Sequence, residues 1–364
     1  MNPSGSWSRY ATSTLAIAAV VLGLNGCRKD ATLPGDEGAG PPTPYLLDLP
    51  TWVIDSVGPM PIPSDNQLTV EGVALGRRLF HEVALSDDGS ISCASCHVQA
   101  NGFGDPRRFS IGTTGQEGTR HAPALVNLGW DTAFFWDGRR AGLETQAHDH
   151  VVKPIEMNAH WSEVVHRLQQ IPEYPPLFNA AFGTVQIDSI LVVRALAQFE
   201  RTLVSFNSRY DQFHSTGDST VLTDTERRGL ALYVGRGACA KCHPLGMFTD
   251  HGLRNVGLEP FNADSGLAGI TGLSTDLGRF KVSSLRNVGV SAPYLHDGRF
   301  SDLMAVMEFY FDHLEASTPN LDHLLIDLLD QQGQFTHAEM MDLIAFLHTL
   351  TDQNFLNNPS FTAP

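Results

Sequence analysis

The chain has 364 residues, of which 42% are hydrophobic and 18% are charged. This is ample apolar material for a packed interior and too long for one small module, so two domains are expected. Asp and Glu outnumber Lys and Arg by 40 to 24, and the formal net charge is −16. Such a charge repels a phosphate backbone and argues against nucleic acid as a partner.

The N-terminus predicts export. Arg9 precedes an apolar run from Leu15 to Leu24, which is too short to cross a bilayer but suits the apolar part of a signal peptide. Residues 1–26 are therefore expected to be removed. The run ends in Leu-Asn-Gly-Cys27, which resembles the lipobox of bacterial lipoproteins, where the cysteine sulfur is lipidated. The alternative is an ordinary secretory signal with an incidental cysteine.

The segment after this cysteine is expected to be a tether. Residues 27–65 are rich in Pro, Gly and Asp, which is typical of an extended linker. Arg28 rather than Asp follows Cys27, and among lipoproteins this favours the outer membrane. The sequence thus predicts a periplasmic protein that reaches the membrane through a lipid anchor only.

A predicted helix leads into the first chemical motif. Apolar residues at helical spacing predict a helix from Val70 to His81, and Cys93-Ala-Ser-Cys96-His97 follows. Two thiols at this spacing meet two vinyl groups on one edge of a porphyrin, and the adjacent His lies under the iron as the proximal ligand. A zinc site needs a second pair of ligands, and a thioredoxin-like pair needs a βαβ context, so the motif predicts a covalently bound haem c.

The same arrangement occurs a second time. A predicted helix from Asp224 to Val234 precedes Cys239, Cys242 and His243, so the chain contains a diverged duplication with two haems. If Cys27 carries lipid, none of the five cysteines is left for a disulfide.

The remaining pattern predicts a mainly α fold, loop-rich, with two cytochrome c-like haem domains in tandem. Residues 189–204 predict a helix, and 214–218 form a polar break that we take as the domain boundary. Two further helices are predicted over 302–313 and 337–350. The expected parts are an N-terminal domain over 66–215, a C-terminal domain over 216–352 and a tail over 353–364.

Five segments resemble the bacterial di-haem cytochrome c peroxidase and MauG family. They are Leu75–His97, Phe134–Arg139 (Phe-Phe-Trp-Asp-Gly-Arg), Pro154–Asn158 (Pro-Ile-Glu-Met-Asn), Phe199–Val204 and Phe280–Arg299. The likeness runs from about Leu68 to Leu350 in order, spacing and content. It implies that the first haem reacts with peroxide and that the second transfers electrons.

The resemblance also assigns three catalytic candidates. Glu156 matches a Glu over the open face of the first haem, where a carboxylate can take a proton from hydrogen peroxide and return it to the leaving oxygen. Gln146 matches a Gln of the same pocket. Trp136 matches a Trp that passes electrons between the haems. The alternatives are a surface Glu, a solvated Gln and an aromatic core residue.

At the first haem the chain departs from the classical members. They carry a second His ligand after a Ser-Ile-Gly segment, whereas Thr113 follows that segment here. Thr is a poor haem ligand, so the resting iron is expected to have an open sixth position, a feature shared with MauG-like members. Four histidines stay open as replacements: His121, His148, His150 and His160.

The second haem shows another departure. Tyr310 stands where classical members hold a Met ligand, and Met307 lies one helical turn earlier. In MauG and its relatives a Tyr ligates this iron, which favours Tyr310, with Met307 or neither residue as the alternatives. His296 matches a His packed near the second haem, beside a propionate.

The resemblance extends to a calcium ion between the domains. The family holds it with an Asn side chain and two backbone carbonyls; Ser291 and Pro293 match the carbonyl positions, but His121 replaces the Asn. Because His is an uncommon ligand for a hard cation, the presence of calcium stays open.

Three functions remain at this point. The leading one is a peroxidase that reduces hydrogen peroxide with electrons from a small cytochrome c or a copper protein. The second is a MauG-like enzyme that oxidises Trp or Tyr residues of a partner protein. The third is a di-haem electron carrier without peroxide chemistry.

Overall fold

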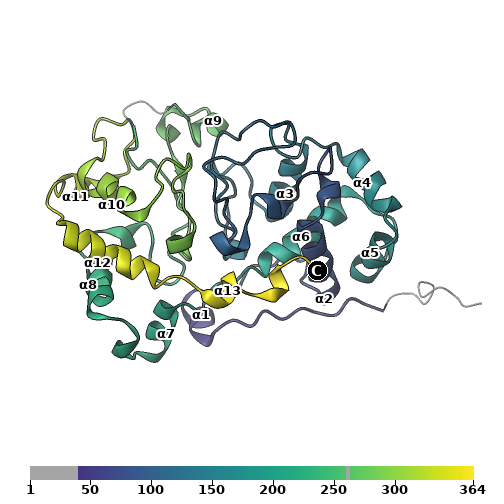
Figure 1. The fold of residues 1–364 in the computed structure, drawn as a ribbon, viewed down its shortest axis with the longest axis horizontal. Helices are drawn as coiled ribbons and strands as arrows, with labels where there is room; N and C mark the ends of the chain where they lie inside the picture. The colour runs from purple at the N-terminus through teal and green to yellow at the C-terminus, as the bar shows by residue number, and fades with distance from the viewer. Residues whose placement is uncertain (1–39, 260–262) are drawn as a thin grey trace, which may run out of the picture. The chain divides into compact units, whose positions relative to one another are not determined.

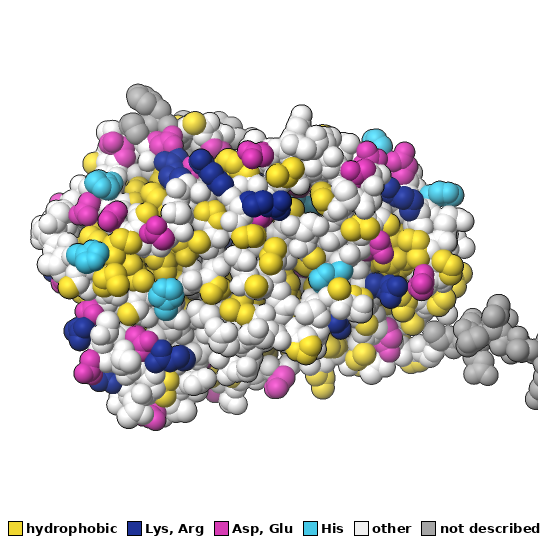
Figure 2. Space-filling view, in the orientation of Figure 1, with side chains coloured by type: hydrophobic (Ala, Val, Ile, Leu, Met, Phe, Trp, Pro, Cys, Tyr) yellow, Lys and Arg dark blue, Asp and Glu magenta, His cyan; other side chains and the backbone are white. Residues whose placement is uncertain are grey.

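The computed structural model describes residues 40–259 and 263–364, which belong to one compact unit. The expected signal peptide, the lipidation site Cys27 and the first part of the tether lie outside the described residues. None of the helices in the described ranges is long and apolar enough to span a membrane. On the face shown in Figure 2, Lys and Arg side chains are interspersed with Asp and Glu.

The described part of the chain is mainly helical with long loops, as expected (Figure 1). Its two strands, β1 (Leu253–Arg254) and β2 (Phe280–Lys281), pair antiparallel with Leu253 opposite Lys281. The helices are α1 (Thr51–Ser56), α2 (Val70–Phe80), α3 (Leu143–Val152), α4 (Trp161–Gln170), α5 (Tyr174–Phe182), α6 (Ser189–Arg201), α7 (Arg209–Thr216), α8 (Asp224–Val234), α9 (Ala268–Thr271), α10 (Leu303–Asp312), α11 (Ile326–Leu329), α12 (His337–His348) and α13 (Gln353–Leu356).

The predicted helices match α2, α8, α10 and α12 to within two residues at each end. Helix α6 ends three residues before the predicted end at residue 204, because the chain is held in a turn there. The Thr202 hydroxyl donates to the Phe199 carbonyl at 2.7 Å, and the Ser205 amide donates to the Asn127 side chain at 2.8 Å. The expected polar break overlaps the end of α7, which stops at Gly217 with a φ of 68°.

Two large hydrophobic cores organise the described residues. The first core contains Leu75 and Phe80 of α2 and Phe199 of α6, and the second contains Tyr233 of α8 and Phe346 of α12. We call the part of the chain that packs on the first core, mainly residues 75–203, the first half. The part that packs on the second core, mainly residues 210–350, is the second half (Figure 1). Tyr210 of α7 already packs in the second core, so the chain passes from one core to the other before residue 210.

Segments near both ends of the described chain pack against the rest of the protein. The expected tail returns to the first core through Phe355 and Phe361, and Arg77 of α2 donates to the Thr362 carbonyl at 2.7 Å. Figure 1 shows the C-terminus beside α2. In the second part of the expected tether, Val53 of α1 is buried in a small third cluster with Trp130.

A close helix crossing lies at the centre of each half. A Cβ atom on Gly76 of α2 would stand 1.9 Å from the Ala195 carbonyl oxygen of α6. A Cβ atom on Gly229 of α8 would stand equally close, at 1.9 Å, to the Asp342 carbonyl oxygen of α12. Only glycine permits such an approach, so each helix that leads to a Cys-x-x-Cys-His motif is fixed on its partner in the same way.

The loops repeat as well. An isolated antiparallel bridge closes Phe134 on Arg140 in the first half, and another closes Tyr294 on Phe300 in the second. Trp136 and His296 hold the same place in these two loops. The duplication read from the haem motifs therefore extends into the segments between them.

Candidate active site

The first Cys-x-x-Cys-His motif presents its histidine in a defined state. Cys93 begins a short 3-10 helix, and the His97 amide donates to the Cys93 carbonyl at 3.0 Å. The Nδ1 atom of His97 lies 2.7 Å from the Phe103 carbonyl oxygen, which accepts a hydrogen bond from Nδ1–H and leaves the lone pair on Nε2 for a metal. Burial lowers the pKa of His97 to about 4, so the ring is neutral at neutral pH.

The second motif repeats this arrangement. The His243 amide donates to the Cys239 carbonyl at 2.9 Å, and Nδ1 lies 2.9 Å from the Phe248 carbonyl oxygen. Burial lowers the pKa of His243. Phe103 and Phe248 both have a positive φ, 62° and 56°, which turns each carbonyl toward its histidine. Tyr233 of α8 adds a hydrogen bond from its hydroxyl to the His243 carbonyl at 2.5 Å.

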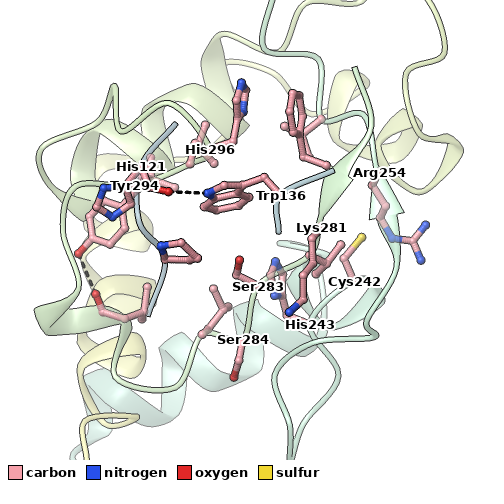
Figure 3. A pocket seen from close by; sticks show the side chains of 18 of the residues that line it. His121, Trp136, Cys242, His243, Arg254, Lys281, Ser283, Ser284, Tyr294 and His296 are labelled. Atoms are coloured by element: carbon pink, nitrogen blue, oxygen red, sulfur yellow. Dashed lines mark hydrogen bonds between the residues drawn. The ribbon is translucent and has the colours of Figure 1, made fainter. Parts of the chain in front are cut away.

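A cavity of about 420 Å³ adjoins the second motif. Cys239, Cys242 and His243 line it together with aliphatic and aromatic side chains (Figure 3). All four motif cysteines are free thiols. Two free thiols beside a neutral imidazole with an available nitrogen, at an apolar cavity, are the donor set that haem c needs. The residues present therefore fit the group.

Two candidate ligands of the second iron face this cavity. Tyr310 and Met307 of α10 both line it, and both are largely buried. Burial raises the pKa of the Tyr310 hydroxyl, and the nearby thiols of Cys242 and Cys239 raise it further. Both side chains thus line the cavity that the second haem would fill. That Tyr310 is the iron ligand stays a prediction.

Glu156 lies in a polar cluster just after α3. Its Oε2 atom is 2.5 Å from Nδ1 of His150, and its Oε1 atom accepts from Lys153 Nζ at 2.9 Å. Burial alone would raise the pKa of this carboxyl, but His150 and Lys153 outweigh burial and lower it to about 2. The Asp87 amide, in the loop that leads to the first motif, donates to the Met157 carbonyl at 2.9 Å, so the segment that carries Glu156 packs against that loop.

Gln146 extends the cluster by one residue. Its Nε2 atom lies 2.7 Å from Nε2 of His150, one helical turn along α3. Its Oε1 atom is buried without a hydrogen-bond partner among the described residues. Gln146 also lines the cavity, together with Phe134 and Phe135, so the cavity extends from the second motif into the first half and meets the cluster at Gln146.

Thr113 is fixed to the same region by its backbone. Its amide donates to the Glu156 carbonyl at 2.9 Å. A Cβ atom on Gly112 would stand 2.3 Å from the Ile155 carbonyl oxygen, so glycine is needed for this contact. The segment that carries Thr113 therefore lies against the segment that carries Glu156.

Trp136 is held by both halves of the chain. Its indole N–H donates to the His121 carbonyl at 2.7 Å (Figure 3). Its own carbonyl accepts from the Lys281 amide at 2.8 Å. The ring lies 6.4 Å from the His296 ring, between centroids. His296 in turn stacks on Phe280 at 3.6 Å, and burial lowers the pKa of His296 to about 4.

The residues matched to a calcium site all line the cavity: His121, Ser291 and Pro293. The His121 amide donates to the His296 carbonyl at 2.8 Å, and Nδ1 of His121 lies 3.3 Å from the Arg108 carbonyl. In the described residues no cluster of three or more His, Cys, Asp or Glu side chains could hold a metal ion.

The histidines considered as replacement ligands have other neighbours. His148 stacks on Trp161 with ring centroids 5.3 Å apart, and His160 stands at the N-terminus of α4. His150 engages Glu156 and Gln146 with its two ring nitrogens.

In the sequence, His150 stands out only as a replacement iron ligand, and nothing marks Lys153. The four-residue spacing of Gln146 and His150 on a helix was a usable signal for the first pair. The loop that brings Glu156 back to His150 had no such signal.

Known proteins resemble this chain over most of its length. A family model described as di-haem cytochrome c peroxidase matches residues 70–220. The methylamine utilization protein MauG of Methylorubrum extorquens is 39% identical over 80% of this chain and 81% of the relative. The cytochrome-c peroxidase IdrP1 of a Pseudomonas species is 31% identical over 84% of this chain and 87% of the relative.

A solved structure agrees with these sequences. The crystal structure of a MauG-like protein associated with microbial copper homeostasis has a TM-score of 0.79 and 32% identity, and covers 88% of this chain and 99% of that one. Two covalently bound haems are implied by this family. The paired motifs, the cavity and the relatives together place the chain in the di-haem cytochrome c peroxidase and MauG family.

Proposed function

We propose that the protein is a di-haem peroxidase that reduces hydrogen peroxide to water with electrons from an external donor protein. Cys93, Cys96 and His97 would hold the haem whose iron binds peroxide, and Cys239, Cys242 and His243 would hold the haem that receives electrons. Tyr310 is the proposed second ligand of the latter haem, and His296 would pack beside that haem. A small cytochrome c or a copper protein is the proposed donor.

The Glu156 cluster carries this proposal. Its two cationic or proton-donating partners, Lys153 and His150, keep the carboxylate ionised beside the first motif. An ionised carboxylate can take one proton from hydrogen peroxide and return it to the oxygen that departs. The unpartnered Oε1 atom of Gln146 offers a second acceptor for a peroxide O–H in the same region.

Trp136 is the proposed electron relay. Hydrogen bonds to residues of both halves fix its position, and its ring faces His296 across the two repeated loops. An indole can be oxidised transiently and has an extended π-system, so a fixed Trp at this place suits transfer between two haems.

A steady-state assay tests the proposal. The holoenzyme is mixed with reduced cytochrome c or a reduced copper protein and hydrogen peroxide, and donor oxidation is followed by absorbance. Rapid turnover is expected. A resting spectrum of two low-spin, six-coordinate haems with no peroxide reaction would contradict the proposal and favour a plain electron carrier.

The second candidate function is oxidation of Trp or Tyr residues in a partner protein. Thr113 in place of a second histidine and Tyr310 on the cavity wall favour it, as does 39% identity to a MauG protein. It predicts near-inactivity with cytochrome c and a long-lived oxidised state after peroxide. Because one similar structure is of a protein associated with copper homeostasis, proteins encoded beside copper-handling genes are the first partners to try.

Export, lipid anchoring and calcium belong to the same proposal. Cys27 is the proposed lipidation site, which would place the protein on the outer membrane facing the periplasm. Labelling of cells with a fatty-acid analogue should mark the wild type and leave Cys27→Ala unmarked. Calcium would be held near Ser291 and Pro293, and metal analysis of the purified holoenzyme before and after chelation tests it.

A further inference from the structure

His150 connects the two side chains assigned to peroxide chemistry. It lies in the last turn of α3, with Nδ1 2.5 Å from Glu156 Oε2 and Nε2 2.7 Å from Gln146 Nε2. Its ring also packs against Phe135, with centroids 5.0 Å apart. Both polar atoms of the imidazole are therefore used inside the cluster.

The partners define which way the hydrogen bonds run. A carboxylate only accepts, so Nδ1 of His150 carries a proton and donates it to Glu156. In the neutral ring Nε2 then accepts, which matches the amide nitrogen of Gln146 as a donor. This orientation leaves Gln146 Oε1 buried, unpartnered among the described residues, and on a residue that lines the cavity.

We propose that His150 is the positioning residue of the peroxide pocket, which aims the Glu156 carboxylate with one ring nitrogen and the Gln146 amide with the other. This inference rests on the proposed function, because it names how the same site is held. It gives each peroxide O–H its own acceptor, Glu156 for one and Gln146 Oε1 for the other.

The physical reason is the freedom that each side chain would otherwise keep. Without His150, the Glu156 carboxylate keeps a single side-chain partner among the described residues, Lys153, and can rotate about that contact. The Gln146 amide loses the contact that distinguishes its oxygen end from its nitrogen end. A misplacement of about 1 Å at such a site costs on the order of 100-fold in rate.

Cyanide binding to the ferric first haem tests the proposal without turnover. Hydrogen cyanide delivers its anion to the iron and its proton to a nearby base, so its association rate reports the same proton acceptor. His150→Phe keeps the contact with Phe135 but removes both hydrogen bonds, and we expect about 10- to 100-fold slower association. His150→Asn keeps one N–H for Glu156, and an intermediate rate is expected.

A double-mutant cycle separates positioning from a general structural effect. If His150 acts through Glu156, adding His150→Phe to Glu156→Gln should change the rate by less than about threefold. His166→Asn, at an exposed histidine of α4, is the matched control and should leave the rate unchanged. If His150→Phe does not retain both haems, His150→Asn and its double mutant decide the same point.

Three results would overturn the inference. The first is a cyanide association rate in His150→Phe equal to that of the wild type. The second is a double-mutant cycle in which the effects of the two substitutions simply multiply. The third is a low-spin to high-spin change in the resting spectrum of His150→Phe, which would make His150 an iron ligand. Failure of the proposed function looks different. In that case the wild type binds cyanide but does not consume peroxide. The cyanide association rates of the variants still decide whether His150 positions Glu156.

Discussion

The two halves of the chain hold their motif histidines alike and differ in what surrounds the remaining space. In both, a backbone carbonyl of a Phe residue fixes the imidazole, at 2.7 Å for His97 and 2.9 Å for His243. In both, a glycine lets the leading helix touch its partner helix. The shared features are the ones that would attach and orient a haem. They are therefore evidence of the duplication and do not distinguish the chemistry of the two halves.

The differences separate two kinds of environment. The first half surrounds its motif with the charged cluster of His150, Lys153 and Glu156, whereas the wall of the second cavity carries Tyr310 and Met307. A further difference lies on the partner helices. Phe199 and Phe346 hold the same place at the two glycine crossings, so the next residues correspond: a buried Glu200 in the first half and Leu347 in the second. The wall of the second cavity also carries ionisable side chains, among them Arg254, Lys281 and Arg299, so the two halves differ in the kind of candidate group beside the motif and not in the presence of charge.

The largest effect is expected when the first half loses its acid–base group. Glu156→Gln keeps the size and hydrogen-bonding shape of the side chain but removes its ability to take a proton. We expect the reaction of peroxide with the resting enzyme to slow by about 100- to 10,000-fold, with the spectra of both haems little changed. Stopped-flow absorbance measures this rate, and Glu163→Gln, on the exposed part of α4, is the control. A rate within threefold of the wild type would remove Glu156 from the mechanism.

The buried Glu200 should make stability depend on pH. Burial raises the pKa of Glu200 to about 8, with Arg201 lowering it and Glu144 raising it. Because the pKa in the folded state lies above the ordinary value of 4.5, the fold favours the protonated acid. The contribution of Glu200 to the free energy of unfolding is fully present below pH 4.5 and is lost as the pH rises through about 8. The loss is at most about 1.4 kcal/mol for each pH unit.

Two substitutions isolate this contribution. Glu200→Gln does not titrate, and Glu200→Leu copies the residue of the second half. Urea unfolding at pH 5, 6.5 and 8 should show the wild type losing free energy of unfolding relative to both variants as the pH rises. A constant difference across this range would mean that Glu200 is already ionised in the fold.

The glycine crossings should be equally sensitive in both halves. An added Cβ at Gly76 or Gly229 would stand 1.9 Å from a backbone oxygen of the partner helix, so the helices must move apart. We expect Gly76→Ala and Gly229→Ala each to lower the free energy of unfolding by about 1–3 kcal/mol. Gly118→Ala is the control, because its nearest neighbour would lie at 3.6 Å. A loss in only one variant would show that the two crossings are not equivalent.

Local sequence patterns were enough to predict the parts that repeat. Apolar spacing located α2 and α8, and the Cys-x-x-Cys-His spacing identified the haem ligands beside them, because both signals lie within a few turns of chain. The resemblance to relatives then pointed to Glu156 and Trp136. Each of these predictions depends on short-range order or on a match of motifs.

What the sequence could not predict depends on contacts between distant segments. His150 and Glu156 meet because a loop turns back after α3, and no periodicity marks that turn. Phe355 and Phe361 fill the first core from a segment that looks like a polar tail. The end of α6 is set by Asn127, far away in the chain. Packing decides such features, and the local pattern does not encode it.

The smallest and most selective effect is expected on α10 of the second half. If Tyr310 is the second ligand of that iron, Tyr310→Phe removes the oxygen and should change the absorption and EPR signals of the second haem while those of the first stay as they are. Met307→Leu, on the same cavity wall, should leave both sets of signals unchanged. The opposite pair of results would identify Met307 as the ligand and bring the second half closer to the classical peroxidases. If neither substitution changes the spectrum, neither residue ligates the iron. The two halves would then differ in the charged cluster around Glu156 and not in the ligand of the second iron.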